Sequence, residues 1–318
     1  DLSLSLNNRA APRTDYRFSD QKPSYVEHSY SVTSGLSYSD VREFSTQRLG
    51  VSHTFSALDA ELPLATVGFD PYAQPTIDPL RGTLSIVHLG YSLSMLEGGR
   101  NAAGVRRGFA LNLSLDFGDE TIGSDETVFA GRMIVNGYVP MPWPGDHTLA
   151  LRSAGGMASG SYSRRGYYYV GGYNLKNTSL LDTITTGAFN GAFVLRGYPP
   201  GQSGGRSFML QNAEYRIPLV KPDRGPSTLP LFLRRIDTNL FVDFGGAFDR
   251  LDTKKVDFFS HGALVHSPQL YTGVGAELWF GTTLAYGLNT HFRLGFAHGM
   301  STAAIPGGQF YFLASSAY

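Results

Sequence analysis

The sequence contains no cysteine and few charged residues, and both features narrow the class of protein. Without cysteine there are no disulfides, no thiolate nucleophile and none of the usual zinc-binding frameworks. Charged residues make up 16% of the chain, well below the ~25% typical of soluble domains. The 26 basic and 26 acidic residues balance, so no excess of positive charge exists to neutralise nucleic-acid phosphates. We therefore expect no nucleic-acid partner.

Long apolar runs are also missing. No stretch of about 18 apolar residues occurs, which excludes a transmembrane helix. Glycine (38 residues), tyrosine (18) and phenylalanine (21) are abundant. Few charges and many aromatics without a long apolar run are typical of a transmembrane β-barrel, because lipid-facing and interior-facing residues alternate along each strand. The chain begins at Asp1 without an initiator methionine or a signal peptide, which we interpret as a mature form or a fragment of a longer protein.

Alternation of apolar and polar residues predicts an all-β fold with about twelve antiparallel strands, and about sixteen at most. The predicted strands cover approximately residues 2–8, 27–38, 42–58, 84–95, 109–117, 127–139, 147–158, 207–219, 231–248, 269–280, 283–298 and 309–318. A change of phase between Ile86 and Val87 indicates a β-bulge. Neither helical periodicity nor a linker interrupts the pattern, so we expect residues 1–318 to form a single domain.

The connections between these strands alternate in length. Those after the second, sixth and tenth strands are short and most others are long, as in an outer-membrane barrel with short periplasmic turns and long extracellular loops. We expect a closed barrel in which the first strand pairs with the last. The residues expected at this lateral seam are Leu2, Leu4, Leu6, Phe310, Phe312 and Tyr318. Because the first strand is short and rich in serine, the seam should have few hydrogen bonds.

No catalytic or metal-binding set emerges from the sequence. Three groups of residues are candidates by type: Asp146 with His147, Asp257 with His261 and His266, and the glycine-rich Gly201–Gly205. The first group lies in a proline-rich turn, and the second lacks the spacing of metal ligands. The third lacks the lysine and helix of a phosphate-binding loop. We expect no enzymatic activity, no cofactor and no metal.

The long connection between predicted strands, roughly residues 159–206, contains Arg196 in an apolar, glycine-rich setting that suits a solvated arginine poorly. Strand alternation predicts that four charged residues face the barrel interior: Glu214, Arg216, Asp243 and Glu277. Gly273 and Gly275 lie in phase with Glu277 and admit close approach of another backbone. An arginine folded inward could pair with any of the three carboxylates. The residues equally allow an ordinary interior charge ladder with an independent, exposed loop.

The segment Arg196-Gly197-Tyr198 is similar to the arginine–glycine–aromatic signature in the sixth extracellular loop of the Omp85 superfamily. Four later segments resemble the final strands of that family in order and spacing: residues 212–219 (NAEYRIPL), 241–245 (FVDFG), 273–278 (GVGAEL) and 292–299 (FRLGFAHG). The resemblance extends over residues 190–318. It implies that the loop folds into the barrel lumen and that Arg196 pairs with Asp243.

The resemblance also implies a function in inserting polypeptide into the outer membrane or translocating it across. Its implied partners are outer-membrane lipid, periplasmic proteins and substrate polypeptides. Family barrels usually have about sixteen strands and are preceded by POTRA modules, whereas this sequence predicts fewer strands and contains no POTRA region. These departures favour an alternative, a non-transporting membrane anchor for a periplasmic or surface domain. A small-solute pore is a third alternative, although a folded-in loop would plug a narrow barrel.

Overall fold

The computed structural model describes residues 2–14, 23–61, 81–98, 103–160, 168–173, 194–225, 231–249, 257–258, 265–266, 269–284 and 287–316. These residues form β-strands and connections, together with one short 3₁₀ turn, η1 (Glu120–Ile122). Within these ranges, no helix has the length and hydrophobicity needed to cross a membrane.

Twelve strands form one antiparallel sheet and pair in the order in which they follow along the chain. Their bounds are β1 (Leu2–Thr14), β2 (Pro23–Val41), β3 (Thr46–Glu61), β4 (Gly82–Gly98), β5 (Val105–Gly118), β6 (Val128–Pro140), β7 (Thr148–Gly160), β10 (Ser207–Val220), β11 (Leu231–Phe248), β14 (Tyr271–Leu284), β15 (Leu288–Gly299) and β16 (Gln309–Ser316). Two small ribbons lie outside the sheet: β8 (Tyr168–Val170) with β9 (Ser203–Gly205), and β12 (Asp257–Phe258) with β13 (Val265–His266). The prediction of twelve antiparallel strands is confirmed, although several strand ends differ.

The two faces of the sheet differ sharply in burial. In β11, Phe241 and Asp243 are 3% and 0% exposed, whereas Leu240 and Val242 are 49% and 40% exposed. We call the face that carries Asp243 the inner face and the opposite one the outer face. Exposed apolar side chains on the outer face extend across the sheet: Leu36, Leu89, Leu115, Met133, Leu151, Leu278, Leu294 and Phe312. An apolar surface of this extent is expected where a sheet contacts lipid.

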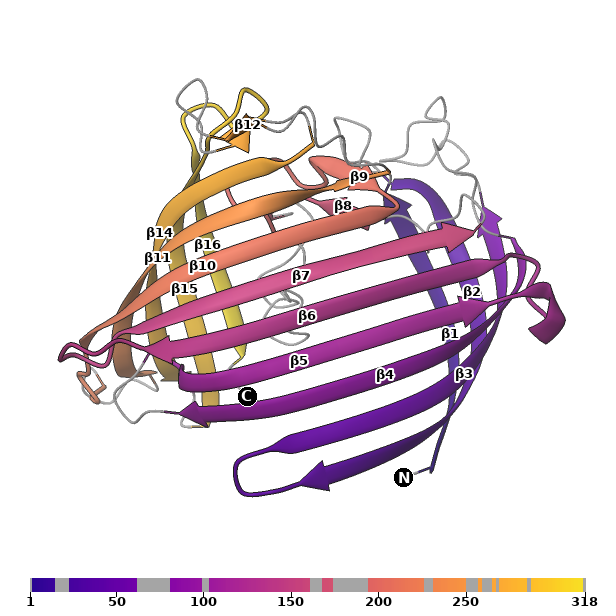
Figure 1. The fold of residues 1–318 in the computed structure, drawn as a ribbon, viewed down its shortest axis with the longest axis horizontal. Coiled ribbons are helices and arrows are strands. Elements are labelled where there is room, and N and C mark those ends of the chain that lie inside the picture. Colours follow the sequence, from indigo (N-terminus) through magenta and orange to yellow (C-terminus); the bar gives the residue numbers. More distant parts are fainter. Residues whose placement is uncertain are drawn as a thin grey trace.

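The sheet is strongly curled, so that the strands near the C-terminus pass behind β5–β7 (Figure 1). Curling brings inner-face side chains of distant strands together around a cavity of about 540 Å³, lined from β5, β6, β7, β10, β14, β15 and β16. In the described part of the chain β1 pairs with β2 and β16 with β15, so β1 and β16 are the two edges of the sheet. The expected ladder between the first and last strands is not among these pairings and stays a prediction.

The first strand is longer than predicted. It does not end near Asn8 but continues to Thr14, paired with β2, and Pro12 lies opposite Val26. A proline lacks the N–H group that a strand between two neighbours would need, but an edge strand tolerates the loss. The prolines and charges after Asn8 therefore indicate an edge strand and not a loop.

The predicted β-bulge at Ile86 is wrong. Ile86 and Val87 keep a regular register with β3, opposite Thr54 and His53. The apolar pattern changes phase because Leu84 and Ile86 lie on the inner face, where they pack with Val128 in a small buried cluster. Val87 and the apolar residues after it lie on the outer face. Two different apolar surfaces meet in one regular strand.

The connection between β7 and β10 corresponds to the predicted interval of residues 159–206, and its described parts are residues 168–173 and 194–206. Val170, Leu195 and Tyr198 from this connection are each 0% exposed. They form a core cluster with inner-face residues of the sheet, which are Ala154, Phe208, Leu210 and Ala247. This buried apolar contact anchors the segment that carries Arg196 against the inner face of β7, β10 and β11.

Candidate functional site

The turn that carries Arg196 is fixed by its own backbone. Gly197 has a φ of 91°, in the left-handed region that favours glycine. A Cβ at this position would lie 2.6 Å from the main-chain nitrogen of Gly299. The hydroxyl of Tyr198 donates a hydrogen bond of 2.7 Å to the carbonyl of Thr272 in β14. These contacts hold the turn between β14 and the end of β15 and orient the Arg196 side chain.

The Arg196 guanidinium forms a two-pronged ion pair with Asp243 of β11. Its Nε donates to Oδ2 and its Nη2 to Oδ1, both over 2.6 Å, and the main-chain N–H donates to Oδ2 over 3.1 Å. Nη1 donates to Oε1 of Glu277 in β14 over 3.0 Å, and Nη2 lies 3.1 Å from Oε1 of Glu214 in β10. The Arg196 Cζ atom lies 3.5 Å from the centroid of the Phe241 ring. All three carboxylates considered from the sequence therefore meet the same arginine.

This cluster is almost completely shielded from solvent. Arg196 is 5% exposed, and Asp243 and Glu277 are 0% and 1% exposed. Burial by itself would lower the pKa of the Arg196 guanidinium, but the charges of the surrounding carboxylates raise this pKa well above its ordinary value. Arg196 therefore stays protonated and bridges β10, β11 and β14 electrostatically.

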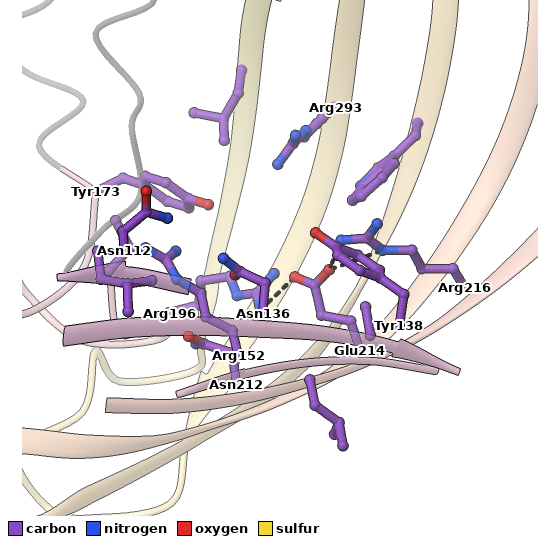
Figure 2. Close-up of a pocket in the computed structure, with 16 residues that line it drawn as sticks. Asn112, Asn136, Tyr138, Arg152, Tyr173, Arg196, Asn212, Glu214, Arg216 and Arg293 are labelled. Atoms are coloured by element: carbon purple, nitrogen blue, oxygen red, sulfur yellow. Dashed lines mark hydrogen bonds and ion pairs between the residues drawn. The ribbon is translucent and has the colours of Figure 1, made fainter. Parts of the chain in front are cut away.

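Arg216 lies beside this cluster and pairs with one of its carboxylates, Glu214. Its Nη2 pairs with Oε2 of Glu214 over 2.7 Å, so Glu214 is shared between two arginines. Its guanidinium also lies over the Trp279 ring, 4.9 Å from the centroid. Figure 2 shows Glu214 between Arg196 and Arg216, with the interactions drawn as dashed lines.

Neutral donors add further hydrogen bonds to Asp243 and Glu277. The Asn212 amide donates to Oδ1 of Asp243 over 2.8 Å. The Tyr311 hydroxyl donates to Oε1 of Glu277 and the Trp279 indole N–H to Oε2, both over 2.6 Å. These donors compensate for the loss of water around the two buried carboxylates. The cluster therefore reaches β16 through Tyr311, as well as β10, β11 and β14.

The two glycines in phase with Glu277 leave room for other groups, as the sequence predicts. A Cβ on Gly273 would lie 2.0 Å from the carbonyl oxygen of Arg196, and one on Gly275 would lie 2.5 Å from Cζ of Phe241. The loop backbone occupies the first space and an aromatic ring the second. Glycine at position 273 is therefore required by the approach of the loop segment, and glycine at position 275 by the Phe241 ring and by the Phe296 carbonyl oxygen, which would lie 2.1 Å from such a Cβ.

Three contributors to the cluster are not identified from the sequence: Phe241, Trp279 and Tyr311. A signal for Tyr311 exists, because Phe310 and Phe312 face outward and strand alternation then places Tyr311 on the inner face. Trp279 and Phe241 likewise share a strand face with Glu277 and Asp243. Their roles depend on contacts between strands, which alternation within one strand does not reveal.

The predicted seam residues lie on the two edge strands. Leu2, Leu4 and Leu6 are 85%, 73% and 75% exposed, and Phe310 and Phe312 are 76% and 51% exposed. Tyr318 lies outside the described residues. The described seam residues thus lie on the edge strands β1 and β16 and have exposed apolar side chains. The described pairings do not join β1 and β16 in a hydrogen-bonded ladder.

The residues considered for catalysis or metal binding have structural contacts. His147 Nδ1 lies 2.7 Å from the Tyr215 hydroxyl, and Asp146 pairs with Arg106 over 3.3 Å. Gly205 and its neighbours form β9. In the described ranges, no group of three or more His, Asp or Glu side chains could hold a metal ion. Asp257 and His266 pair through β12 and β13, and His261 lies outside the described residues.

Among solved structures, the fold is similar to BamA from Haemophilus ducreyi lacking POTRA domains 1–3, with a TM-score of 0.57 and 15% sequence identity. The alignment covers 99% of this chain and 59% of the BamA chain. CdiB from Acinetobacter baumannii aligns over 98% of this chain and 46% of its own, at 13% identity and a TM-score of 0.45. At that score the second likeness carries no argument. No family model and no curated protein matches the sequence.

The chain, with its curled antiparallel sheet, has a fold similar to that of the BamA chain. It spans about 59% of the length of the BamA chain to which it is similar. At 15% identity this likeness concerns the fold alone.

Proposed function

We propose that this chain is the membrane barrel of an Omp85-type protein that inserts polypeptide into the outer membrane or translocates it across. The observation that carries the proposal is the pairing of Arg196 with Asp243 over 2.6 Å. The same pair is implied by the sequence resemblance. The fold similarity to BamA, at 15% identity, supports the same assignment from backbone geometry.

The proposal includes a closed barrel in the outer membrane, in which β1 meets β16 and the loop segment around Arg196 occupies the lumen. The curled sheet and the exposed apolar outer face support this arrangement. Its partners are outer-membrane lipid, periplasmic proteins and substrate polypeptides, and not nucleic acid. In this proposal residues 1–318 form a single barrel domain that does not act as an enzyme.

The proposed mechanism depends on the unequal stability of the two sides of the barrel. The cluster around Arg196 joins β10, β11, β14 and β16 by buried ion pairs and hydrogen bonds. The seam, in contrast, is limited by β16, of which 8 residues are described. A ladder of that length is among the weakest in a barrel and could open towards lipid. Arg196 would keep the rest of the wall and the loop in place during opening.

Crosslinking the proposed seam tests this function. The chain has no native cysteine, so Leu4→Cys combined with Phe310→Cys or Phe312→Cys gives a unique pair, and two partners allow for an unknown register. The activity to measure is the folding of an added, denatured outer-membrane protein into vesicles that contain this chain. We expect oxidation to stop folding and a reductant to restore it. The Leu4→Cys single variant controls for the substitution.

A fully crosslinked variant that is as active as the parent would contradict a function that requires seam opening. A parent without activity in either redox state would contradict the insertion function itself.

A non-transporting anchor is the second candidate, and the density of the Arg196 cluster favours it. Six groups from the loop and four strands, most of them buried, are held at distances of 2.6–3.1 Å, which suits a static support. Conductance in planar bilayers separates both candidates from a solute pore, because the insertase and the anchor each predict a small or erratic signal. A steady, large conductance would instead support a solute pore and contradict both.

A further inference from the structure

The cavity beside the Arg196 cluster has a wall that is rich in arginine. It measures about 540 Å³ and is lined by Arg152, Arg196, Arg216 and Arg293 but by one carboxylate, Glu214. Asp243 and Glu277 lie behind Arg196 and pair with it. Four arginines therefore face three carboxylates, and the described wall carries a surplus of positive charge. Such a surplus in a space with low-dielectric walls attracts an anion.

Two of the arginines are positioned by an aromatic ring. Arg293 lies over Trp279, 4.4 Å from the ring centroid, and Arg216 lies 4.9 Å from the same centroid. A guanidinium stacked on an aromatic face still presents its N–H groups in the plane of the fork. Arg152, in β7, lines the opposite part of the wall beside Asn136, and Figure 2 shows their side chains with that of Arg293 around one space.

The position of the cavity indicates the side from which a ligand would enter. Tyr138 and Arg216 line it near the ends of β6 and β10 that lead into the short connections 141–147 and 221–230. Tyr173, Val194 and Arg196, from the long connection, form its opposite end. A ligand would therefore reach the arginines from the end of the sheet with the short turns.

We propose that this cavity is a binding site for a small oxyanion, carboxylate or phosphate, held by Arg152 and Arg293 with Arg216 and Asn136 completing the shell. The planar fork of arginine matches both oxyanions with paired hydrogen bonds. The volume lies in the range of about 300–1,000 Å³ that is usual for small-molecule sites. Because none of Arg152, Arg216 and Arg293 lies on β1 or β16, the proposal does not depend on insertion or translocation activity.

Binding can be measured on the full chain in nanodiscs of zwitterionic phosphatidylcholine, with inorganic phosphate and succinate as separate probes. Trp143→Phe leaves Trp279 as the single tryptophan, and the contacts of Trp279 with both arginines make its fluorescence a local reporter. We expect saturable changes with at least one probe, weakening as ionic strength rises. A response to phosphate alone or to succinate alone identifies which oxyanion the site accepts.

Charge-removing variants decide whether the arginines hold the anion. Arg152→Gln and Arg293→Gln should each weaken binding about tenfold, and the double variant about a hundredfold. Arg293→Lys keeps the charge without the fork and should weaken binding less. Arg132→Gln is a matched control, because Arg132 lies on the inner face, bonds the Ser114 hydroxyl and does not line the cavity. The proposal is overturned if neither probe binds the parent, or if the double variant binds as tightly as the Arg132→Gln control.

Discussion

Replacement of Arg196 by methionine should destabilise the fold more than any other single substitution of a charged residue in the described chain. The variant leaves Asp243 and Glu277, at 0% and 1% exposure, next to Glu214 without their shared cation. Removing one partner of a buried ion pair costs about 3–5 kcal/mol. Arg196→Lys keeps the charge but loses the two-pronged geometry at Asp243, and should cost about 1–3 kcal/mol.

The double variant Arg196→Met with Asp243→Asn sharpens this prediction. It removes one charge of each sign, so its loss of unfolding free energy should fall short of the sum of the single losses by about 1–3 kcal/mol. Urea unfolding in phospholipid vesicles, followed by Trp279 fluorescence in a Trp143→Phe background, measures these values. Trp279 donates to Glu277 over 2.6 Å and therefore reports on the cluster.

Arg132→Met serves as the control, since a single hydrogen bond of 3.2 Å to Ser114 predicts a loss below about 0.5 kcal/mol. The reasoning is refuted if Arg196→Met unfolds at the same urea concentration as the parent. It is also refuted if the losses of Arg196 and Asp243 variants are strictly additive, because the two side chains would then be energetically independent.

Three further outcomes are expected, the first two from the same unfolding assay. Gly273→Ala should destabilise the fold by about 1–3 kcal/mol, since its Cβ would lie 2.0 Å from a loop carbonyl oxygen. The control Gly137→Ala should be neutral, because its Cβ meets nothing within 4 Å. Equal losses of stability in the two variants would contradict this reasoning. Tyr311→Phe should cost about 1–3 kcal/mol, because a carboxylate buried on β14 loses a donor, and an unchanged midpoint would count against it. The Thr83 amide and hydroxyl lower the pKa of Asp125 below 3.8, so this contact stabilises fully above that pH and is lost as pH falls through the lowered value. The protection factor of the Thr83 amide, which corrects for the pH dependence of intrinsic exchange, should then fall in acid and stay constant in Asp125→Asn; a parent whose protection factor does not fall would oppose the assignment.

Strand alternation predicts much of the fold because each side of the sheet has its own solvent. In β11 the outward Leu240 and Val242 place Asp243 on the inner face, and the burial of these residues agrees. The same reasoning places Glu214 and Glu277 inward. An arginine in a long apolar connection then needs a carboxylate, and the sequence limits the choice to three.

Two-residue periodicity within a strand does not predict the register between neighbouring strands. Arg196 meets all three carboxylates because the register of β10, β11 and β14 sets Asn212 opposite Asp243 and Asn239 opposite Glu277. Alternation also misleads at Ile86, where apolar residues lie first on the inner face and then on the outer face of one strand, so that a regular strand resembles a β-bulge. The length of an edge strand is also predicted poorly, because β1 continues through Pro12, a residue that suggests a loop.

The separations along the chain between Arg196 and its partners imply an order of folding. Asp243 and Glu277 lie 47 and 81 residues after Arg196. Contacts of such range form late, since the intervening chain must first be organised. Until β14 has joined β11, an early burial of Arg196 would lack one of its counter-charges. Burial of this single side chain should therefore mark completion of the C-terminal half of the sheet, and Trp279 fluorescence should change in the last kinetic phase of refolding.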